Sequence, residues 1–518
     1  MPRCWSKIGA LLALLPVLSL AVPELHAGPA KMDTLSLWVM DQGINTGSSL
    51  QKLTRKFTLQ TGVPVKIRFL DWGSAFDVLT HALSASAEEG AGPDVLQLGS
   101  SWVPYFAKQG LISPITDLID RADTSRFYEE SMKSAYVGRG NTLYSLPWFL
   151  DVRCFFVNEK AWLELGLHDG DIETFPKFFG VLRAVAEANV QNEAGNQVVP
   201  FEYGVKGDWT GYQQMAPILW NFGGDFVAEE NGSYRSALVD SLTLVGLRHY
   251  FKFLRDVDVS PYNLHENSSG AADRFIRSEQ LIIYGTSELI RKIEFDNASG
   301  GLMESPIAKD GLITVSAPKG PAGAFTFVGG SHLALAQNNA LAKKDLAREF
   351  FLFMLRADNI DFYSRHSGFI PSDRSLIRIW MQDSRYSQLV NDLERAGRSC
   401  PNIPEWSEIE TLVNAMVNKV GESLTRENSD INETIAGLVY DTHVNVNKVL
   451  GREDKMDRGL QIARIKKILM QPVEEELYMG KIGIEEKSNV SMRLVVVLAL
   501  GLVAIVLLLV YIIRVRKR

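Results

Sequence analysis

Cysteine is scarce in this chain, with only 3 among 518 residues. This excludes a disulfide-rich scaffold and any zinc or iron–sulfur module built on cysteine. Cys4 lies in the first few residues, which leaves Cys154 and Cys400 in the body. In an oxidising compartment these two could pair, or they could be two buried free thiols. The sequence leaves both alternatives open.

Positive charge is also in short supply, because 54 Lys and Arg residues face 61 Asp and Glu residues and give a net charge of −7. A chain this acidic is a poor partner for a nucleic-acid backbone. The catalytic patterns H-E-x-x-H, G-x-S-x-G and the P-loop are missing, and the 8 His residues have no short metal-ligand spacing. We therefore expect no enzyme, no metal and no cofactor.

The first 27 residues have the pattern of a secretory signal. Arg3 and Lys7 form a basic start, residues 8–22 are an apolar stretch, and Ala27 offers a small residue for cleavage. An uncleaved N-terminal anchor is the alternative.

The C-terminal end predicts a membrane span. Residues 494–513 carry no charge and are long enough to cross about 30 Å of hydrocarbon, and the basic tail 514–518 follows at once. The positive-inside rule places that tail in the cytoplasm. Residues 452–493 are charged and helix-prone, and we expect them to form a stalk. The prediction is a single-pass protein of the inner cell membrane with its body on the periplasmic, extracytoplasmic side.

Strand and helix patterns alternate in the first third of the body, which is typical of an α/β protein with a parallel sheet. Ligands in such sheets bind beyond the carboxyl ends of the strands. Asp41, Gln42, Trp72, Ser101 and Trp102 follow three successive strand patterns, so we expect them at one rim. The expected strands are 35–40, 63–70 and 93–98, and the expected helices are 48–61 and 71–87.

Short motifs follow one another in a fixed order between residues 33 and 450. They include FTLQTGVPVKI (57–67), GPDVLQL (92–98), FAKQGLISPI (106–115), GNTLYSLP (140–147), NFGGD (221–225), GGSHLAL (329–335) and GFIP (368–371). In this order they resemble the family 1 bacterial extracellular solute-binding proteins, the sugar-receptor group that includes the maltose-binding protein. A C-terminal stalk and span are not typical of that group.

The resemblance implies two α/β lobes of the type II periplasmic-binding-protein fold, joined by a hinge that the chain crosses three times. Lobe 1 would hold residues 33–150 with 286–328, and lobe 2 would hold 151–285 with 331–451. The crossings are expected near 150–152, 284–288 and 328–331, with Leu150, Gly285, Gly329 and Gly330 as hinge residues.

A sugar would need flat aromatic rings against its C–H faces and carboxylate, amide or Arg groups against its hydroxyls. Core packing is the alternative for each Trp, and a hinge ion pair is the alternative for Asp151 and Arg153. Relatives carry a carboxylate at the first crossing, and Trp406 or Glu410 could close the cleft from the last helix. The candidate ligand-binding residues are Asp41, Gln42, Trp72, Ser101, Trp102, Asp151, Arg153, Trp209, Tyr212, Gln213, Ser287, Trp406 and Glu410.

By this resemblance the protein would be a membrane-tethered receptor that binds a carbohydrate between its lobes and delivers it to the permease subunits of an ABC importer. The alternative is a membrane-anchored sensor that passes lobe closure to a signalling partner. The short tail 514–518 leaves no room for an output domain, so a sensor would need a separate partner protein.

Overall fold

The computed structural model describes residues 34–42, 45–85, 92–119, 121–137, 142–338, 341–426, 430–480 and 482. The predicted signal 1–27, the predicted span 494–513 and the tail 514–518 lie outside these residues. Within the described residues, no helix combines the length and the apolar character that a membrane crossing requires.

Lobe 1 is built on three parallel strands, β1 (Leu35–Met40), β2 (Val65–Leu70) and β3 (Val95–Gly99), in the order β2-β1-β3. The strands β1 and β3 read as nearly continuous apolar runs because helices cover both faces of the sheet. The expected α/β class is confirmed. The helices of this lobe are α1 (Thr46–Thr61), α2 (Trp72–Ser84), α3 (Val103–Lys108), α4 (Arg121–Thr124), α5 (Glu129–Lys133), α13 (Leu341–Met354) and α14 (Ala357–Ser367).

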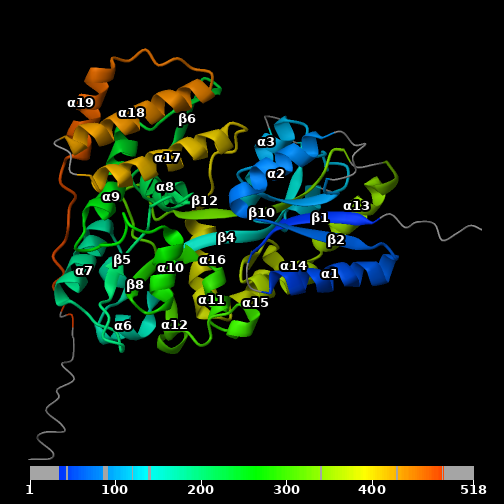
Figure 1. The fold of residues 1–518 in the computed structure, drawn as a ribbon, viewed down its shortest axis with the longest axis horizontal. Helices are drawn as coiled ribbons and strands as arrows, with labels where there is room; N and C mark the ends of the chain where they lie inside the picture. Colours follow the sequence, from blue (N-terminus) through cyan, green and yellow to red (C-terminus); the bar gives the residue numbers. More distant parts are fainter. Residues whose placement is uncertain are drawn as a thin grey trace, which may run out of the picture.

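Two long antiparallel strands, β4 (Ser145–Asn158) and β10 (Thr326–Leu335), run through the middle of the molecule and join the lobes (Figure 1). In lobe 1, the far half of β10 pairs with β3. In lobe 2, the far half of β4 pairs with β8 (Gln280–Thr286) and β9 (Leu312–Val315), and β5 (Val199–Phe201) extends that sheet. The two lobes are therefore one continuous sheet with a waist at these two strands.

Helices surround the sheet of lobe 2, and a hairpin of β6 (Val227–Glu230) and β7 (Ser233–Ser236) lies outside it. A separate cluster of buried residues packs against the waist strands and includes Leu150, Cys154 and Trp380. The helices are α6 (Glu159–Glu164), η2 (Asp169–Ile172), α7 (Phe175–Ala188), α8 (Gly211–Asn221), α9 (Ser241–Arg255), α10 (Ser268–Ile276), α11 (Glu288–Lys292), η3 (Asn297–Ser299), α12 (Pro306–Asp310), η4 (Arg374–Leu376), α15 (Ile377–Trp380) and α16 (Ser384–Ala396).

The course of the chain between the lobes differs from the expectation. The strand β9, expected in lobe 1, pairs with the lobe 2 half of β4 and covers its free edge. Gly285 pairs with Cys154 inside lobe 2, so 284–288 is not a crossing. The chain crosses in β4, returns in β10, and crosses again between β11 (Ile370–Pro371), which pairs with β4, and β12 (Gly397–Arg398), which pairs with β10.

The expected stalk is largely part of the body. The helices α17 (Trp406–Leu424), α18 (Ile431–Val449) and α19 (Arg458–Leu469) stack on lobe 2, in gold and orange in Figure 1. Ile462, Ile465 and Leu469 are buried, because their spacing puts them on one face of α19 that packs against α9 and α18. The stalk prediction is wrong for residues 458–469, whose charged residues lie on the opposite face.

The chain continues from α19 as an extended segment along lobe 2, which we call the C-terminal strap (residues 470–480). The backbone N–H of Glu476 donates to the carbonyl of Pro176 at 3.0 Å. Val473 and Tyr478 pack against the core of lobe 2. The strap is thus docked over the face of α7 and is not a free linker.

Candidate ligand-binding cleft

A cavity of about 410 Å³ lies between the lobes beside the waist strands, within the size range of small-molecule sites. It brings together all the sequence-predicted ligand residues except Ser287 and Trp406. They are Asp41, Gln42, Trp72, Ser101, Trp102, Asp151, Arg153, Trp209, Tyr212, Gln213 and Glu410. Gly329 and Gly330 also line it, whereas Leu150 is buried in the strand behind.

The lobe 1 wall comes from the carboxyl ends of the parallel strands. Asp41 and Gln42 follow β1, Trp72 begins α2 after β2, and Ser101 with Trp102 follows β3. The side chain of Asp71 accepts the backbone N–H of Gly73 at 2.9 Å and so fixes the start of α2 beside Trp72. The rim forms here because parallel strands end together at one edge of a sheet.

Three tryptophan rings form an aromatic surface that spans both lobes. Trp72 meets Trp102 edge to face, with ring centroids 5.4 Å apart and 64° between the planes. Trp209, from the lobe 2 segment before α8, lies nearly parallel to Trp72, at 6.4 Å and 17°. Trp209 is 54% exposed, although tryptophan is usually well buried. Flat exposed rings of this kind suit the apolar face of a ligand.

The floor of the cleft is polar and comes from β4. Asp151 and Arg153 are two residues apart in this strand, so their side chains share one face. Arg153 Nη2 lies 3.9 Å from Asp151 Oδ2 and donates to Gln213 Oε1 at 2.5 Å. This bond joins the waist to α8. The hinge ion pair that the sequence left open is thus present, but it is long.

Several buried polar atoms around this floor have no hydrogen-bond partner within the described chain. They are Gln42 Nε2, Asp151 Oδ1, Arg153 Nε and Glu410 Oε2. A buried polar atom left without a partner costs about 1–3 kcal/mol, so native proteins rarely leave several in one place. Both donors and acceptors are free, which is the complement that a set of ligand hydroxyl groups would need.

Burial also shifts the titration of two cleft carboxyls. Burial raises the pKa of Asp151, the charge of Arg153 opposes this, and the charge of Glu288 adds to it. Burial raises the pKa of Glu410 to about 8, and hydrogen bonds from Ser101 and Tyr212 offset part of that shift. Ser101 belongs to lobe 1 and Glu410 to α17 on lobe 2, so this carboxyl reaches across the cleft.

Ser287 and Trp406 do not line the cavity. Ser287 is buried and its hydroxyl donates to the carbonyl of Gly368 at 3.3 Å, because the end of β8 turns its neighbours Thr286 and Glu288 toward the cleft instead. Trp406 is fully buried where α17 packs on α8, with its ring 5.7 Å from that of Tyr212. It is a core residue that supports the cleft from behind.

Sequence reasoning missed a group of residues next to the waist. Phe149 and Ser331 are neighbours of predicted hinge residues, and Phe369 lies within the GFIP motif, so each had a signal nearby. Glu288 ends the expected crossing 284–288, and it forms a 2.8 Å ion pair with Lys292 one turn later on α11. Nothing in the sequence marked Lys292. Ser100 lines the cavity beside the predicted Ser101, and the missed lining residues are Gly99, Phe149, Thr286, Glu288, Lys292, Phe327, Ser331 and Phe369.

Cys154 and Cys400 are both free thiols, so the possible disulfide is not formed. Within the described part of the chain, no three His, Cys, Asp or Glu side chains gather in a way that would hold a metal ion. The described cleft presents aromatic rings, carboxyls, amides, hydroxyls, the guanidinium group of Arg153 and the ammonium group of Lys292.

Two lobes joined by shared strands, with an aromatic and polar cavity between them, define a two-lobed ligand-binding protein. The family model of the bacterial extracellular solute-binding proteins matches residues 41–360, and the chain belongs to this family. The diacetylchitobiose binding protein DasA of Streptomyces coelicolor is 26% identical over 379 residues, which cover 73% of this chain and 82% of that protein. This relative is named as a binding protein.

Solved structures share the fold. An ABC transporter solute-binding protein of Thermotoga lettingae, bound with α-D-tagatose, superposes with a TM-score of 0.65 at 19% identity, covering 81% of this chain and 100% of that one. The GacH receptor of Streptomyces glaucescens, solved unliganded and with acarbose, superposes with a TM-score of 0.64 at 17% identity, covering 82% and 100%. The likeness extends over both lobes.

Proposed function

We propose that this protein is an extracytoplasmic receptor that binds a carbohydrate in the cleft between its lobes and delivers it to an ABC importer. The observation that carries the proposal is the pairing of exposed or half-buried tryptophan rings with buried, unpartnered polar atoms in one cavity. A pyranose has the matching surfaces, with C–H faces for the rings and a girdle of hydroxyls for the polar atoms. A relative named for binding diacetylchitobiose, and structures of the same fold solved with tagatose and with acarbose, support this class of ligand.

Both lobes contribute to the same ligand surface, which favours binding coupled to closure. Trp72 and Trp209 face each other from different lobes. On the rim, Lys108 of lobe 1 and Glu405 of lobe 2 form a 2.6 Å ion pair. A ligand held between the lobes would stabilise the closed arrangement over the open one, as in other hinge-type binding proteins. The closed surface would then be what the importer recognises.

Tethering to the membrane is the further part of the proposal. It rests on the uncharged residues 494–513 and the basic tail 514–518. A tethered receptor stays near its permease, because the anchor raises the local concentration without any new contact between the two.

The test is thermal unfolding of the full chain against a panel of sugars, polyols, amino acids and phosphorylated compounds. A ligand at 100 times its dissociation constant adds about 2.7 kcal/mol to the free energy of unfolding. We expect the largest rise in melting temperature with a mono- or oligosaccharide. A rise with an amino acid and with no sugar would refute the carbohydrate assignment.

Two tryptophan variants separate binding from packing. Trp209→Ala should abolish the sugar-dependent rise and leave the unliganded melting temperature nearly unchanged, because the ring is half exposed. Trp406→Ala is the matched control, and it should lower the unliganded free energy of unfolding by about 3–5 kcal/mol because its ring is fully buried. Calorimetric titration of both variants gives the affinities.

A further inference from the structure

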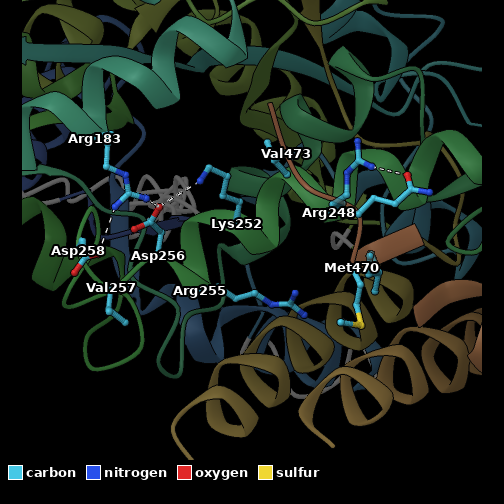
Figure 2. A pocket seen from close by; sticks show the side chains of 11 residues that line it. Arg183, Arg248, Lys252, Arg255, Asp256, Val257, Asp258, Met470 and Val473 are labelled. Carbon is cyan, nitrogen blue, oxygen red and sulfur yellow. Dashed lines mark hydrogen bonds and ion pairs between the residues drawn. The ribbon is translucent and has the colours of Figure 1, made fainter. Parts of the chain in front are cut away.

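A second pocket lies on lobe 2 and shares no lining residue with the cleft. Its volume is about 390 Å³, and α7, α9, residues 256–258 and the start of the C-terminal strap surround it. Figure 2 shows its basic side chains beside the strap residues Met470 and Val473. The proposed binding of a sugar between the lobes does not involve this pocket.

Four basic side chains line the pocket, one from α7 and three from α9. Arg248, Lys252 and Arg255 are four and three residues apart, so they share one face of α9, and Arg183 of α7 also lines the pocket (Figure 2). Like charges at this spacing repel one another on a helix unless anions compensate them. The acidic residues of the pocket therefore decide how much of this positive charge is left without a partner.

Two of the four cations are fully compensated. Arg183 contacts Asp256 at 2.5 Å and Asp258 at 3.4 Å. Lys252 contacts Asp256 at 3.3 Å and forms a second ion pair with Glu475 of the strap. These pairs use both acidic residues that line the pocket.

The other two cations, Arg248 and Arg255, form no ion pair within the described residues. Arg248 donates to the neutral amide of Gln471 at 2.8 Å, and its Nε is buried without a partner within the described chain. No hydrogen bond or ion pair from the described residues reaches the guanidinium group of Arg255. Burial lowers the pKa of both guanidinium groups, and for Arg248 the charge of Glu474 opposes this shift. Partly desolvated charges without a partner are costly to keep.

We propose that this pocket is an anion site that binds a phosphate group between Arg248 and Arg255. A guanidinium group offers a planar fork of N–H donors that matches two oxygens of a phosphate, and two such groups suit an ion with several oxygens and up to two negative charges. The phosphate would come from a free or phosphorylated small molecule, or from the headgroup of an anionic lipid.

The first experiment measures thermal unfolding of the full chain in detergent with potassium phosphate, against potassium chloride at equal ionic strength. Wild type should show a saturable rise in melting temperature with phosphate alone. Arg255→Gln should remove that rise and also raise the melting temperature without phosphate, because it deletes a desolvated, unpaired charge. Arg248→Gln tests the same site independently. Arg378→Gln, at an exposed position on α15, is the matched control and should leave the phosphate response intact.

A second arm distinguishes the two sources of phosphate. The full chain is placed in vesicles of phosphatidylcholine, with or without phosphatidylglycerol, and hydrogen exchange of residues 469–473 is measured. Slower exchange with phosphatidylglycerol in wild type, but not in Arg255→Gln, assigns a lipid headgroup, and a response to soluble phosphate alone assigns a free anion. If neither probe acts, or if both pocket variants keep the wild-type response, the proposal is refuted. Sugar binding in the cleft should be unchanged in both variants, so failure here would not touch the receptor proposal.

Discussion

Individual side chains in the cleft are held in an unfavourable state that a ligand would relieve. Glu410 shows this best, since its Oε2 is buried without a partner within the described chain and its pKa is about 8 instead of its ordinary 4.5. In the unliganded protein at neutral pH this carboxyl is mostly protonated. It can then donate one hydrogen bond to a hydroxyl and accept another.

Stability should depend on pH through this residue. Between pH 4.5 and 8 the folded protein keeps a proton on Glu410 that the unfolded chain releases, so the free energy of unfolding falls as pH rises through that range. One such group contributes a slope of at most about 1.4 kcal/mol per pH unit. Glu410→Gln should flatten the curve, as measured by denaturant unfolding at several pH values.

Glu202 gives the comparison for that measurement. Burial raises its pKa also to about 8, next to Glu266 and Arg274 in lobe 2 and away from the cleft. A residual slope of the same sign should therefore persist in Glu410→Gln. If the Glu410→Gln curve keeps the full wild-type slope, the protonation assigned to this carboxyl is wrong.

At the scale of elements, the docking of the strap on α7 depends on one glycine. A Cβ atom at Gly180 would lie only 1.8 Å from the carbonyl oxygen of Glu476, so the strap reaches its place because this helix position has no side chain. Helices rarely retain glycine without such a reason, because alanine is more favourable there by about 1 kcal/mol. The strap therefore packs against α7 at the position where Gly180 has no side chain.

Gly180→Ala should release the strap while leaving α7 folded. The expected result is faster hydrogen exchange and easier proteolysis within residues 470–480, with the cleft's affinity for its ligand unchanged. Gly437→Ala on α18 is the matched control, since the nearest atom to its added Cβ is a flexible Arg458 nitrogen at 3.7 Å. That variant should be neutral or slightly stabilising. If residues 470–480 stay protected from exchange and proteolysis in Gly180→Ala, the docking of the strap does not depend on the missing side chain at this position.

At the scale of the whole molecule, the lobes are joined by few strands. The waist consists of β4 and β10 with the short partners β11 and β12. Gly330 lies there with φ of 137°, and a Cβ at this position would lie 2.4 Å from the carbonyl oxygen of Phe149. Only glycine fits this point, and the register of β10 against β4 shifts just after it, between Ser331 and His332. Rotation of one lobe on the other has to be absorbed in this region.

Ligand binding should shorten the distance between the lobes. Spin labels on cysteines placed at Leu59 of α1 and Leu242 of α9, both exposed, report that distance by pulsed electron resonance once the native cysteines are replaced by alanine. The sugar found in the thermal screen should shift the distribution to shorter distances. The same sugar should leave it unchanged with Asp151→Asn at the same concentration. No shift in the parent would mean that binding occurs without closure.

Much of the cleft could be predicted from the sequence, because its lobe 1 wall depends on local rules. Asp41, Trp72 and Trp102 follow strand patterns, and parallel strands end at one edge. The sequence could not distinguish Trp209 from Trp406, since both lie at the start of a helical segment in polar surroundings. Packing of α17 on α8 decides that one ring is exposed and the other buried. The sequence likewise could not place β9, because its partner strand β4 lies more than 150 residues earlier in the chain.

The sequence alone determined the α/β class, the family, the rim residues after the strands and the lack of a catalytic or metal site pattern. These follow from local periodicity, composition and motif order, which need no knowledge of distant contacts. Only the tertiary structure decided where the chain crosses between lobes, which polar atoms are left unpartnered in the cleft, and that residues 458–480 pack on lobe 2. Each of these depends on burial by segments far away in the chain, and burial is a property of the folded molecule.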